Sequence, residues 1–386
     1  MSIALAPGLG LLALAIWLYL LLARGGFWLA RGRDNRDVPP DPARWPSVVA
    51  VVPARNEADV IARSIGSLLR QDYPGEFRVV LVDDGSDDGT AEAARHAARG
   101  AGTRLEILPG MPLPPGWTGK LWAVNQGVRH ATATTPPDHI LLTDADIGHA
   151  PDNLRALVAR SEQGRHALVS LMAELSCANA AERFLIPAFV FFFQMLYPFA
   201  WVANPQRRMA AGAGGCMLVR REALEAAGGI AAIRAAIIDD CALARRLKMQ
   251  GPIWLGLTRR ARSLRPYGSA GEIGRMVSRS AYAQLGYSPL LLAGTLAGMV
   301  LTYLVPLALA LFGTGLAQVA GLAAWLLMAL SFQPMLRFYR VSPLWGFALP
   351  AIGAAYTAFT LQSALQVWRG RGGMWKGRAQ AMAGGG

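Results

Sequence analysis

Three pairs of aspartates in this chain have the residue type and spacing to carry chemistry. Each pair follows a short apolar run of the kind that forms a buried strand. The pairs are Asp83 with Asp84, Asp144 with Asp146, and Asp239 with Asp240. For one pair alone, helix capping is the simpler explanation, because Asp at a helix start accepts hydrogen bonds and complements the helix dipole. Three pairs at one sheet edge would repel each other unless a cation or a proton-transfer role required them.

A divalent cation would account for this charge. Mg²⁺ and Mn²⁺ bind carboxylate and phosphate oxygens together. In a pair such as Asp144 and Asp146, one carboxylate can hold the metal while the other binds the metal or a ribose hydroxyl. The metal makes a bound diphosphate a better leaving group, and a carboxylate elsewhere can take a proton from an attacking hydroxyl. We therefore expect Mg²⁺ or Mn²⁺ as the cofactor.

The elements that must position these aspartates alternate between strands and helices. Short apolar runs predict strands at 48–52, 79–82, 105–108, 139–142 and 167–172. Helices are expected after Asn56, which would cap the first, from Thr90, at 121–130, at 152–162 and from Asp239. The alternation predicts an α/β domain with a mostly parallel sheet. Ligands bind at the carboxyl ends of such strands, so the aspartates are expected to meet there.

Charged residues are unevenly distributed, and the gaps between them predict membrane spans. They make up 16% of the 386 residues, below the ~25% usual in soluble domains. None occurs in 1–23, 280–336 or 341–368. A span needs roughly 20 apolar residues, so the first gap predicts one transmembrane helix, the second is long enough for two, and the third for one.

The chain is expected to have five parts. They are an N-terminal transmembrane helix at 1–23, a basic, Pro-rich linker at 24–46, the α/β domain at 47–279, two to three C-terminal transmembrane helices within 288–368, and a basic interfacial tail at 369–386. The uncharged stretch 184–206 lies between two aspartate pairs that must share one side of the membrane. We expect an interfacial or re-entrant segment there, with a buried core helix as the alternative.

Basic residues predict the orientation and the partners. Arginines cluster after the first apolar stretch, which favours a multi-pass protein of the inner (cytoplasmic) membrane with its large domain facing the cytoplasm. The net charge of +13 is scattered without a basic-aromatic patch, so an anionic membrane surface is favoured over nucleic acid. The three cysteines lack paired spacing and are expected to be reduced core residues.

The order of motifs resembles the family 2 glycosyltransferases with a GT-A fold. The motifs are VVPARNE, VDDGSDDGT, GKLWAVNQG, TDAD, GAGGCMLVRREAL and IDD, within about residues 47–260. The IDDCALARRL stretch and the apolar C-terminal region look closest to hopene-associated (hopanoid-cluster) glycosyltransferases, and more distantly to ceramide glucosyltransferases. This resemblance implies a GT-A nucleotide-sugar-binding domain at 47–279.

The resemblance also implies roles for the donor-binding residues. Pro53, Arg55 and Glu57 would line the nucleotide pocket after the first strand. Asp84 would accept a hydrogen bond from the uracil N–H, and Lys120 would lie near the donor phosphates.

Further roles concern the metal and the reacting groups. Asp144 and Asp146 would be the D-x-D pair, with Asp146 the more direct metal ligand. Gly214 and Gly215 would let the backbone approach the sugar or acceptor closely. Asp240 would be the catalytic base of an inverting, single-displacement reaction.

One feature departs from the family pattern, and another conflicts with the positive-inside rule. The membrane-bound and processive members carry Gln/Arg-x-x-Arg-Trp, whereas this chain has GRMVSRSAYAQLGYS without Arg-Trp. Arg275 or Arg279 could bind the phosphate and Tyr282 could supply the aromatic ring, although membrane anchoring explains the arginines equally well. One N-terminal and three C-terminal spans would also put the basic tail outside, against the positive-inside rule.

The expected function is a membrane-bound, metal-dependent, inverting transfer of one sugar from a nucleotide-sugar, expected to be UDP-linked, to a lipid such as a hopanoid. The alternatives are a polyprenyl-phosphate sugar transferase, whose acceptor needs no general base, and a non-catalytic nucleotide-binding membrane scaffold. The donor sugar, the acceptor and the oligomeric state are left open by the sequence.

Overall fold

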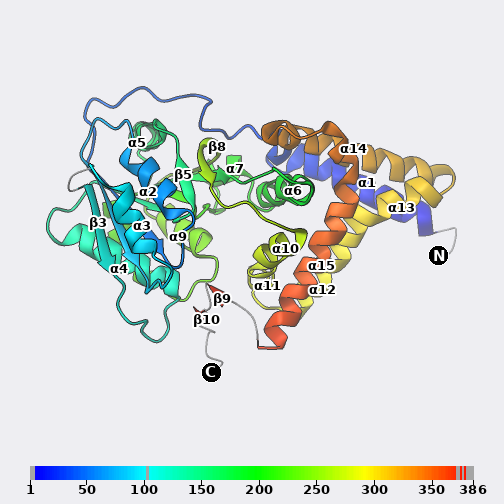
Figure 1. Cartoon of the computed structure of the whole chain (residues 1–386). Coiled ribbons are helices and arrows are strands. Elements are labelled where there is room, and N and C mark those ends of the chain that lie inside the picture. Colours follow the sequence, from blue (N-terminus) through cyan, green and yellow to red (C-terminus); the bar gives the residue numbers. More distant parts are fainter. Residues whose placement is uncertain (1–4, 101–103, 371–373, 376–377, 380–386) are drawn as a thin grey trace. The chain divides into compact units, whose positions relative to one another are not determined.

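The computed structural model describes residues 5–100, 104–370, 374–375 and 378–379. The chain divides into two compact units, each built from separate stretches of sequence. The helical unit comprises the described residues of Met1–Arg31, Cys177–Ala200 and Tyr267–Gly372, and the sheet unit those of Gly32–Ser176, Trp201–Pro266 and Gly373–Gly386. Figure 1 traces both units along the chain.

An eight-stranded, mostly parallel sheet forms the centre of the sheet unit. Its order is β3-β2-β1-β4-β7-β6-β8-β5, with only β7 and β5 antiparallel to their neighbours. The strands are β1 (Val48–Ala54), β2 (Phe77–Asp83), β3 (Leu105–Pro109), β4 (His139–Thr143), β5 (Ile147–His149), β6 (Leu168–Glu174), β7 (Cys216–Arg220) and β8 (Ile253–Ser263). The predicted α/β class and mostly parallel sheet are confirmed.

Helices cover both faces of this sheet. They are α2 (Ile61–Leu69), α3 (Thr90–Ala97), α4 (Gly119–Ala133), α5 (Asn153–Gly164), α8 (Arg221–Ala226), the 3-10 turn η3 (Ile230–Ile233) and α9 (Asp239–Lys248). Alternate residues of β1, such as Ala50 and Val52, join α2 and α5 in one core. Val51 points to the other face, where it lies against Gly127 of α4. This alternation follows from the two-residue repeat of a strand.

The predicted strands are all present, but three strands of the eight-stranded sheet were not predicted. These are β5, β7 and β8. β5 has three residues, and β8 reads IWLGLTRRARS, which carries arginines and a glycine instead of a continuous apolar run. The helix expected after Asn56 begins only at Ile61, with Val60 before it, so the prediction that Asn56 caps this helix is wrong. Residues 57–60 form a turn in which the Glu57 carbonyl accepts from Val60 and Ile61.

The helical unit contains the apolar helices. They are α1 (Leu5–Ala23), the 3-10 turn η1 (Phe27–Leu29), α6 (Ala180–Leu196), α10 (Ala270–Ser278), α11 (Ala281–Gln284), α12 (Pro289–Met299), the π-helical η4 (Val300–Leu304), α13 (Val305–Phe312), α14 (Gly315–Tyr339), the 3-10 turn η5 (Pro343–Ala348) and α15 (Leu349–Trp368). In sequence, the division between the two units falls within α7 (Phe199–Ala203), after Ala200. Four helical runs among the described residues are long and apolar enough to span a membrane: Leu5–Ala23, Pro289–Phe312, Gly315–Tyr339 and Pro343–Trp368.

The division into units differs from the expected domain plan. Residues 177–200 and 267–279 belong to the helical unit instead of the α/β domain, whereas residues 32–46 join the sheet unit. Asp34 explains the second difference, because its buried carboxylate accepts from Thr258 and pairs with Arg260 at 3.1 Å. In the stretch 184–206, α6 has a largely buried surface and contains Pro187. Most of the predicted tail at 369–386 lies outside the described residues, apart from the short strands β9 (Met374–Trp375) and β10 (Arg378–Ala379).

Candidate functional site

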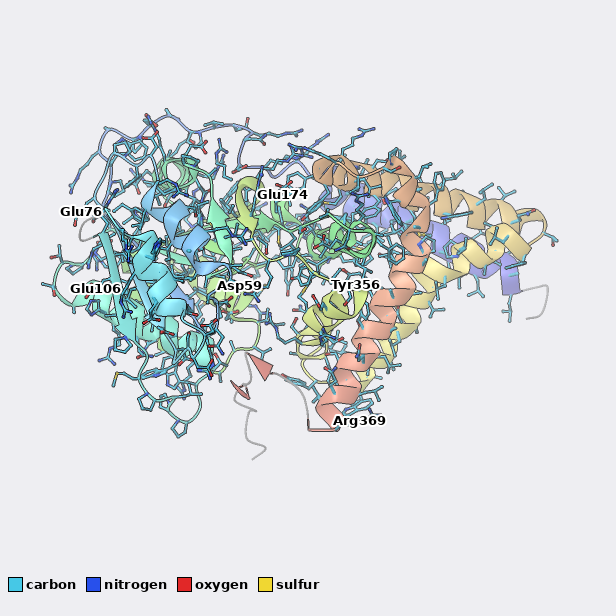
Figure 2. All side chains as sticks on the ribbon, in the orientation of Figure 1. Asp59, Glu76, Glu106, Glu174, Tyr356 and Arg369 are labelled. Atoms are coloured by element: carbon cyan, nitrogen blue, oxygen red, sulfur yellow. The ribbon has the colours of Figure 1, made fainter. Side chains whose placement is uncertain are left out.

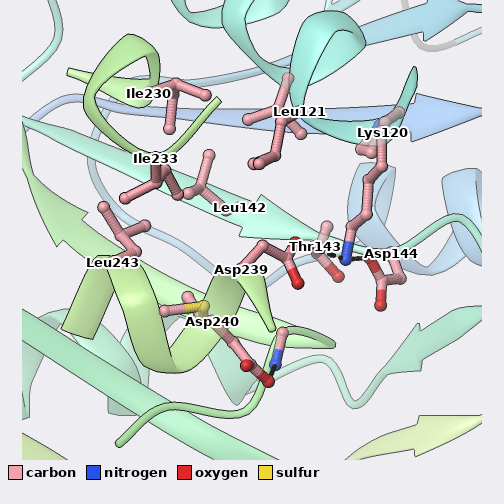
Figure 3. Close-up of a pocket in the computed structure, with 14 residues that line it drawn as sticks. Lys120, Leu121, Leu142, Thr143, Asp144, Ile230, Ile233, Asp239, Asp240 and Leu243 are labelled. Atoms are coloured by element: carbon pink, nitrogen blue, oxygen red, sulfur yellow. Dashed lines mark hydrogen bonds and ion pairs between the residues drawn. The ribbon is translucent and has the colours of Figure 1, made fainter. Parts of the chain in front are cut away.

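A recess in the sheet unit gathers residues from the ends of β1 and β4, from the starts of α4 and α9, and from the loop before β7 (Figure 3). Five residues that the sequence predicted for the site line it: Pro53, Lys120, Asp144, Gly214 and Asp240. The other lining residues are Leu121, Val124, Leu142, Thr143, Met217, Ile230, Ile233, Asp239 and Leu243. The recess therefore combines an apolar wall with a cluster of charged groups.

The Lys120 ammonium bridges two of the aspartate pairs. Its Nζ lies 2.9 Å from Asp144 Oδ1 and 3.1 Å from Asp239 Oδ2 (Figure 3). Burial alone would lower the pKa of Lys120, but these carboxylates outweigh burial and raise it, so the side chain is an ammonium at neutral pH. Lys120 is the second residue of α4, after the Thr118 cap. The helix N-terminus and this ammonium together favour an anion such as phosphate.

The Asp240 carboxylate is held by backbone N–H groups at the floor of the recess. Gly214 N–H donates to Oδ2 at 3.0 Å and Cys241 N–H donates to Oδ1 at 2.7 Å. Burial and the neighbouring Asp239 raise the pKa of Asp240, against the opposing influence of Lys120. A fixed carboxylate with a raised pKa suits a general base, because its proton affinity is closer to neutral pH. Asp239 itself, in the first turn of α9, was expected only as the other half of the pair.

Neither Asp144 nor Asp146 caps a helix, because β5 follows them and α5 begins only at Asn153. Burial, with the carboxylates of Asp144 and Glu57, raises the pKa of Asp146 to about 6. A cation beside Asp146 would offset this repulsion and favour its ionised form. No group of three metal-binding side chains occurs among the described residues. Mg²⁺ is commonly held by one or two carboxylates with substrate phosphates and water, so Asp144 and Asp146 fit such an ion.

The loops after β1 and β2 are joined beside the recess. The Arg55 guanidinium donates to the carbonyls of Asp84 and Gly85, and its Nη1 lies 3.9 Å from the Asp84 carboxylate, which is buried. Asn56 has a left-handed φ of 51° and its side chain accepts from Asp87 N–H at 3.1 Å. Asn56 therefore links the two loops instead of capping α2. Arg55, Glu57 and Asp84 lie on these loops and not in the lining of the recess.

Sequence reasoning missed Arg265, which lies just after β8. Its guanidinium contacts the Glu57 carboxylate and lies 2.9 Å from Asp59 Oδ1. The same positive charge opposes the raised pKa of Asp146. Arg265 thus binds the loop after β1 and, through its charge, lowers the pKa of the second aspartate of the TDAD motif, Asp146. No sequence signal identified it, because this contact joins residues about 200 positions apart.

A buried network beneath the recess was also missed. His149 Nε2 lies 3.0 Å from the Thr143 hydroxyl, which donates to the Gly215 carbonyl at 2.7 Å. The Asn153 amide nitrogen lies 2.9 Å from His149 Nδ1. These partners fit a neutral imidazole that donates from Nε2 and accepts at Nδ1. Burial lowers the pKa of His149 to about 4, which keeps it neutral.

The two predicted glycines have different surroundings. A Cβ on Gly214 would lie 3.4 Å from Lys120 Nζ and 3.7 Å from Asp240 Oδ2, so any larger side chain would fill the recess. A Cβ on Gly215 would instead meet Ile147 at 3.2 Å, away from the recess. A side chain at Gly215 would therefore press on Ile147 of β5, and the Gly215 carbonyl accepts from the Thr143 hydroxyl.

The candidates for the missing Gln/Arg-x-x-Arg-Trp motif belong to the helical unit. Arg279 directly follows α10 and Arg275 lies in its last turn. Tyr282 is fully buried, and its hydroxyl donates to the Tyr287 carbonyl at 2.7 Å. The Tyr282 ring is therefore a core residue of the helical unit and not an exposed stacking surface. The assignment of Arg279 to the donor phosphates stays a prediction.

Known proteins share this sequence pattern and this fold. The family Glycosyl transferase family 2 matches residues 49–228, and Glycosyl transferase family group 2 matches residues 139–358, more than half of the chain. An N-acetylglucosaminyltransferase from Mesorhizobium japonicum is 29% identical over 195 residues, which cover 48% of this chain and 42% of that protein. Beta-monoglucosyldiacylglycerol synthase from Trichormus variabilis is 30% identical over 210 residues, covering 53% and 42%. The chain thus spans less than half the length of these curated relatives.

A solved structure has a related fold over nearly the whole chain. It is the mannosyltransferase PcManGT from Pyrobaculum calidifontis, in complex with GDP-Man and Mn²⁺, with a TM-score of 0.55 and 20% identity. The similarity covers 94% of this chain and 99% of that one, and at this identity it concerns the fold alone. With its GT-A-like α/β sheet and these family matches, the chain belongs to glycosyl transferase family 2.

Proposed function

We propose that this chain is a glycosyltransferase that moves one sugar from a nucleotide-sugar, a UDP-sugar in the first instance, to a hydroxyl of a membrane lipid, with inversion at the anomeric carbon. The observation that carries the proposal is the recess in which Asp240 lies with Lys120, Asp144 and Asp239. The acceptor hydroxyl would give its proton to Asp240 while its oxygen bonds to the anomeric carbon. The bond from that carbon to the nucleoside diphosphate would break.

Charged residues of the site would bind the nucleotide-sugar donor. Asp144 and Asp146 would hold Mg²⁺ or Mn²⁺, which when bound supplies positive charge to the leaving diphosphate. Lys120, at the N-terminus of α4, would bind the same phosphates. The buried Asp84, with Arg55 and Glu57, would bind the nucleoside, and the uracil N–H would donate to Asp84.

The apolar helices support a lipid as the acceptor. Four candidate membrane-spanning helices fit association with a membrane, and one curated relative carries the name Beta-monoglucosyldiacylglycerol synthase. A hopanoid or another lipid hydroxyl is the proposed acceptor, and the proposed location is the inner membrane with the sheet unit in the cytoplasm. An acceptor that stays in the bilayer gives a reason to anchor the enzyme there.

The test uses membranes that contain the full chain, incubated with UDP- and GDP-sugars, a lipid extract and Mn²⁺, and mass spectrometry of the glycolipid formed. The wild type should form a new glycolipid and release nucleoside diphosphate. Asp240→Asn should reduce turnover by about 100-fold or more, within the usual range for general-base catalysis. Nucleotide binding, followed by calorimetry, should be nearly unchanged in this variant.

Other outcomes would assign a different function. A mild effect of Asp240→Asn with transfer to polyprenyl phosphate would indicate the alternative acceptor, because a phosphate needs no general base. Absence of metal-dependent nucleoside diphosphate release with every donor and lipid extract would overturn transfer and favour a nucleotide-binding scaffold. Release with GDP-sugars but not UDP-sugars would correct the proposed donor only.

A further inference from the structure

The direction of each apolar helix in the helical unit can be read from its contacts. On α1, a Cβ at Gly10 would lie 3.3 Å from Leu309 of α13, and Trp17 Nε1 donates to the Thr302 carbonyl of η4 at 2.9 Å. Residues later in α1 therefore contact residues earlier in the continuous helical run Pro289–Phe312. Here this run is named the rod, comprising α12, η4 and α13. α1 and the rod are antiparallel.

α14 runs in the same direction as α1. Its beginning lies beside the first half of α1, because a Cβ at Gly10 would meet Ala320 at 3.2 Å. Further along α14, the Phe332 ring lies 5.1 Å from Phe191, which in turn lies 5.2 Å from Phe27, just beyond α1. α14 is therefore antiparallel to the rod, as expected for the second half of a helical hairpin.

α15 is antiparallel to the rod as well. Near its start, a Cβ at Gly353 would lie 2.7 Å from the Tyr303 ring of η4. Near its end, Ala364 packs with Leu292 and Tyr282 at the beginning of the rod. Figure 1 shows α12 and α15 side by side. α15 thus leads back to the level at which the rod begins.

Two consecutive helices with the same direction cannot both be complete crossings. The segment 340–348, which connects α14 to α15, explains why the two helices run in the same direction. After Tyr339 the chain folds back along α14, where Trp325 Nε1 donates to the Phe347 carbonyl at 3.0 Å. Tyr339 lies fourteen positions after Trp325 on α14, which is about 21 Å of helix. The chain therefore retraces much of α14 before α15 begins at Leu349.

The end of α15 packs against an amphipathic helix with charged residues. Ser278 Oγ donates to the Phe359 carbonyl at 3.0 Å, and Tyr282 N–H donates to Ser363 Oγ at 3.0 Å. α10, which carries Ser278, exposes Arg275 and is followed by the exposed Arg279. Charged side chains are costly in hydrocarbon, so α10 belongs at a membrane surface. Only six residues separate α10 from β8, so that surface is on the side of the sheet unit.

We infer that α15 is a re-entrant helix that enters and leaves the bilayer on the side of the sheet unit. Three segments would then cross: α1, the rod and α14. The chain after Trp368 returns to the side of the sheet unit, and α10 with the second half of α15 forms a surface for lipid headgroups there. This arrangement places the basic tail with the other basic segments, as the positive-inside rule requires. The inference rests on the proposed membrane location and not on the transfer reaction.

The test measures sidedness in the full-length protein in sealed vesicles of both orientations. In a background without the native cysteines that retains transfer activity or a wild-type melting temperature, one cysteine is introduced at an exposed position and labelled with a membrane-impermeant maleimide. The positions are Glu92→Cys in the sheet unit, Thr314→Cys between the rod and α14, and Arg369→Cys after α15, where Arg369 is labelled in Figure 2. A hydrophilic C-terminal epitope, digested by added protease, gives a second readout of the tail.

Arg369→Cys and the epitope should react in the same vesicle orientation as Glu92→Cys, and Thr314→Cys in the opposite one. Reaction of the epitope in the orientation of Thr314→Cys would show that α15 crosses the membrane and would overturn the inference. Should the cysteine at 369 be unreactive in both orientations, the epitope still decides. Loss of sugar transfer leaves this result unaffected, so the two proposals fail separately.

Discussion

At the residue scale, the ammonium of Lys120 lies between carboxylates that belong to different elements. Asp144 follows β4 and Asp239 begins α9, and one positive charge within 3.1 Å of both offsets their repulsion. Among the described residues, no ammonium forms an ion pair with Asp146 or Asp240, and the pKa of each is raised by burial and by a neighbouring carboxylate. The site therefore contains two kinds of carboxylate. Asp144 and Asp239 are bridged by Lys120, whereas Asp146 and Asp240 have raised pKa values.

The proposed metal role of Asp146 can be tested with Asp146→Ala. We expect metal-dependent transfer to fall by about 100-fold or more, since even residues behind metal ligands cost 10–100-fold. The melting temperature should stay within a few degrees of the wild type, because the substitution removes a buried carboxylate that repels its neighbours. Initial rates at several Mn²⁺ concentrations and a thermal melt provide the two measurements.

Asp87→Ala is the matched control for that substitution. Asp87 is an exposed aspartate in the loop after β2, and its backbone, not its carboxylate, bonds to Asn56. This control should retain both activity and stability. If Asp146→Ala instead lowers the melting temperature and leaves turnover intact, Asp146 has a structural role.

At the element scale, α4 can deliver Lys120 to the recess only because it packs very closely on the sheet. A Cβ on Gly127 would lie 2.5 Å from Val51 Cγ1 and 3.0 Å from Val82 Cγ2. The absence of a side chain at Gly127 thus sets the distance between α4 and strands β1 and β2. The same helix carries Lys120 in its first turn, so packing and site geometry are coupled.

Gly127→Ala should destabilise the sheet unit by about 1–3 kcal/mol, the usual cost of overpacking a core. The double variant Gly127→Ala/Val51→Ala should recover part of this loss, because it removes the methyl group that the new Cβ meets first. Denaturant or thermal unfolding measures both effects. Gly294→Ala is the control, since a Cβ at this helical glycine has nothing within 4 Å. Equal stability of Gly127→Ala and the wild type would contradict the packing argument.

Lys248 fixes the segment that leads from α7 towards the recess. Its Nζ donates to the carbonyls of Val202 and Met209, both at 2.6 Å, and burial lowers its pKa. Lys248→Met keeps the length of the apolar stem but leaves these carbonyls without their donor, at a cost of about 1–3 kcal/mol.

The expected result of Lys248→Met is faster amide hydrogen exchange within residues 203–210 than in the wild type, measured by mass spectrometry. Lys248→Arg should show a smaller increase, because a guanidinium can still donate. Arg246→Met, at an exposed position on the same helix, is the control and should leave this exchange unchanged. Unchanged exchange in Lys248→Met would show that other contacts hold the segment.

At the scale of the whole molecule, each unit is assembled from separate stretches of chain. The helical unit combines described residues of 1–31, 177–200 and 267–372, and the sheet unit includes the stretch 32–46 before its first strand. Stability therefore depends on contacts between distant segments. The buried network of His149 is one example, since it ties β4 and α5 to the Gly215 carbonyl before β7.

Global stability should depend on pH through His149. Its pKa is about 4 in the folded protein and ~6.5 in an unfolded chain. The unfolded state therefore binds the proton first as pH falls, and the contribution of the neutral imidazole is lost between about pH 6.5 and 4. A shift of this size corresponds to on the order of 3 kcal/mol.

A comparison of wild type with His149→Gln isolates this effect, because carboxylates that titrate in the same range are common to both proteins. At pH 7.5 the variant should melt below the wild type, since it loses the bonds to Thr143 and Asn153. The difference should shrink by about 5 °C or more at pH 5. A difference that stays constant between these pH values would mean that His149 is not held neutral in the fold.

The sequence by itself determined the elements whose signals are local. Continuous apolar runs such as 48–52 become buried strands because both faces of a parallel sheet are covered, and each predicted strand is present. Of the three aspartate pairs, those at 83–84 and 144–146 lie at strand ends as expected, whereas Asp239 and Asp240 begin α9; Asp144, Asp239 and Asp240 line one recess with Lys120. The positions of the predicted strands were enough to bring residues after β1 and β4 together, because the carboxyl ends of parallel strands lie at one edge of the sheet.

Only the tertiary structure decided which distant residues meet. The contact of Arg265 with Glu57 joins positions 208 apart. The Asn56 side chain bonds to the loop after β2 and does not cap α2, contrary to the prediction from the sequence. The directions of α14 and α15 are likewise absent from their composition, since both are simply long and apolar. Hydrophobicity fixes that such a helix is buried in lipid or protein, whereas side-chain packing against specific neighbours fixes which way it runs.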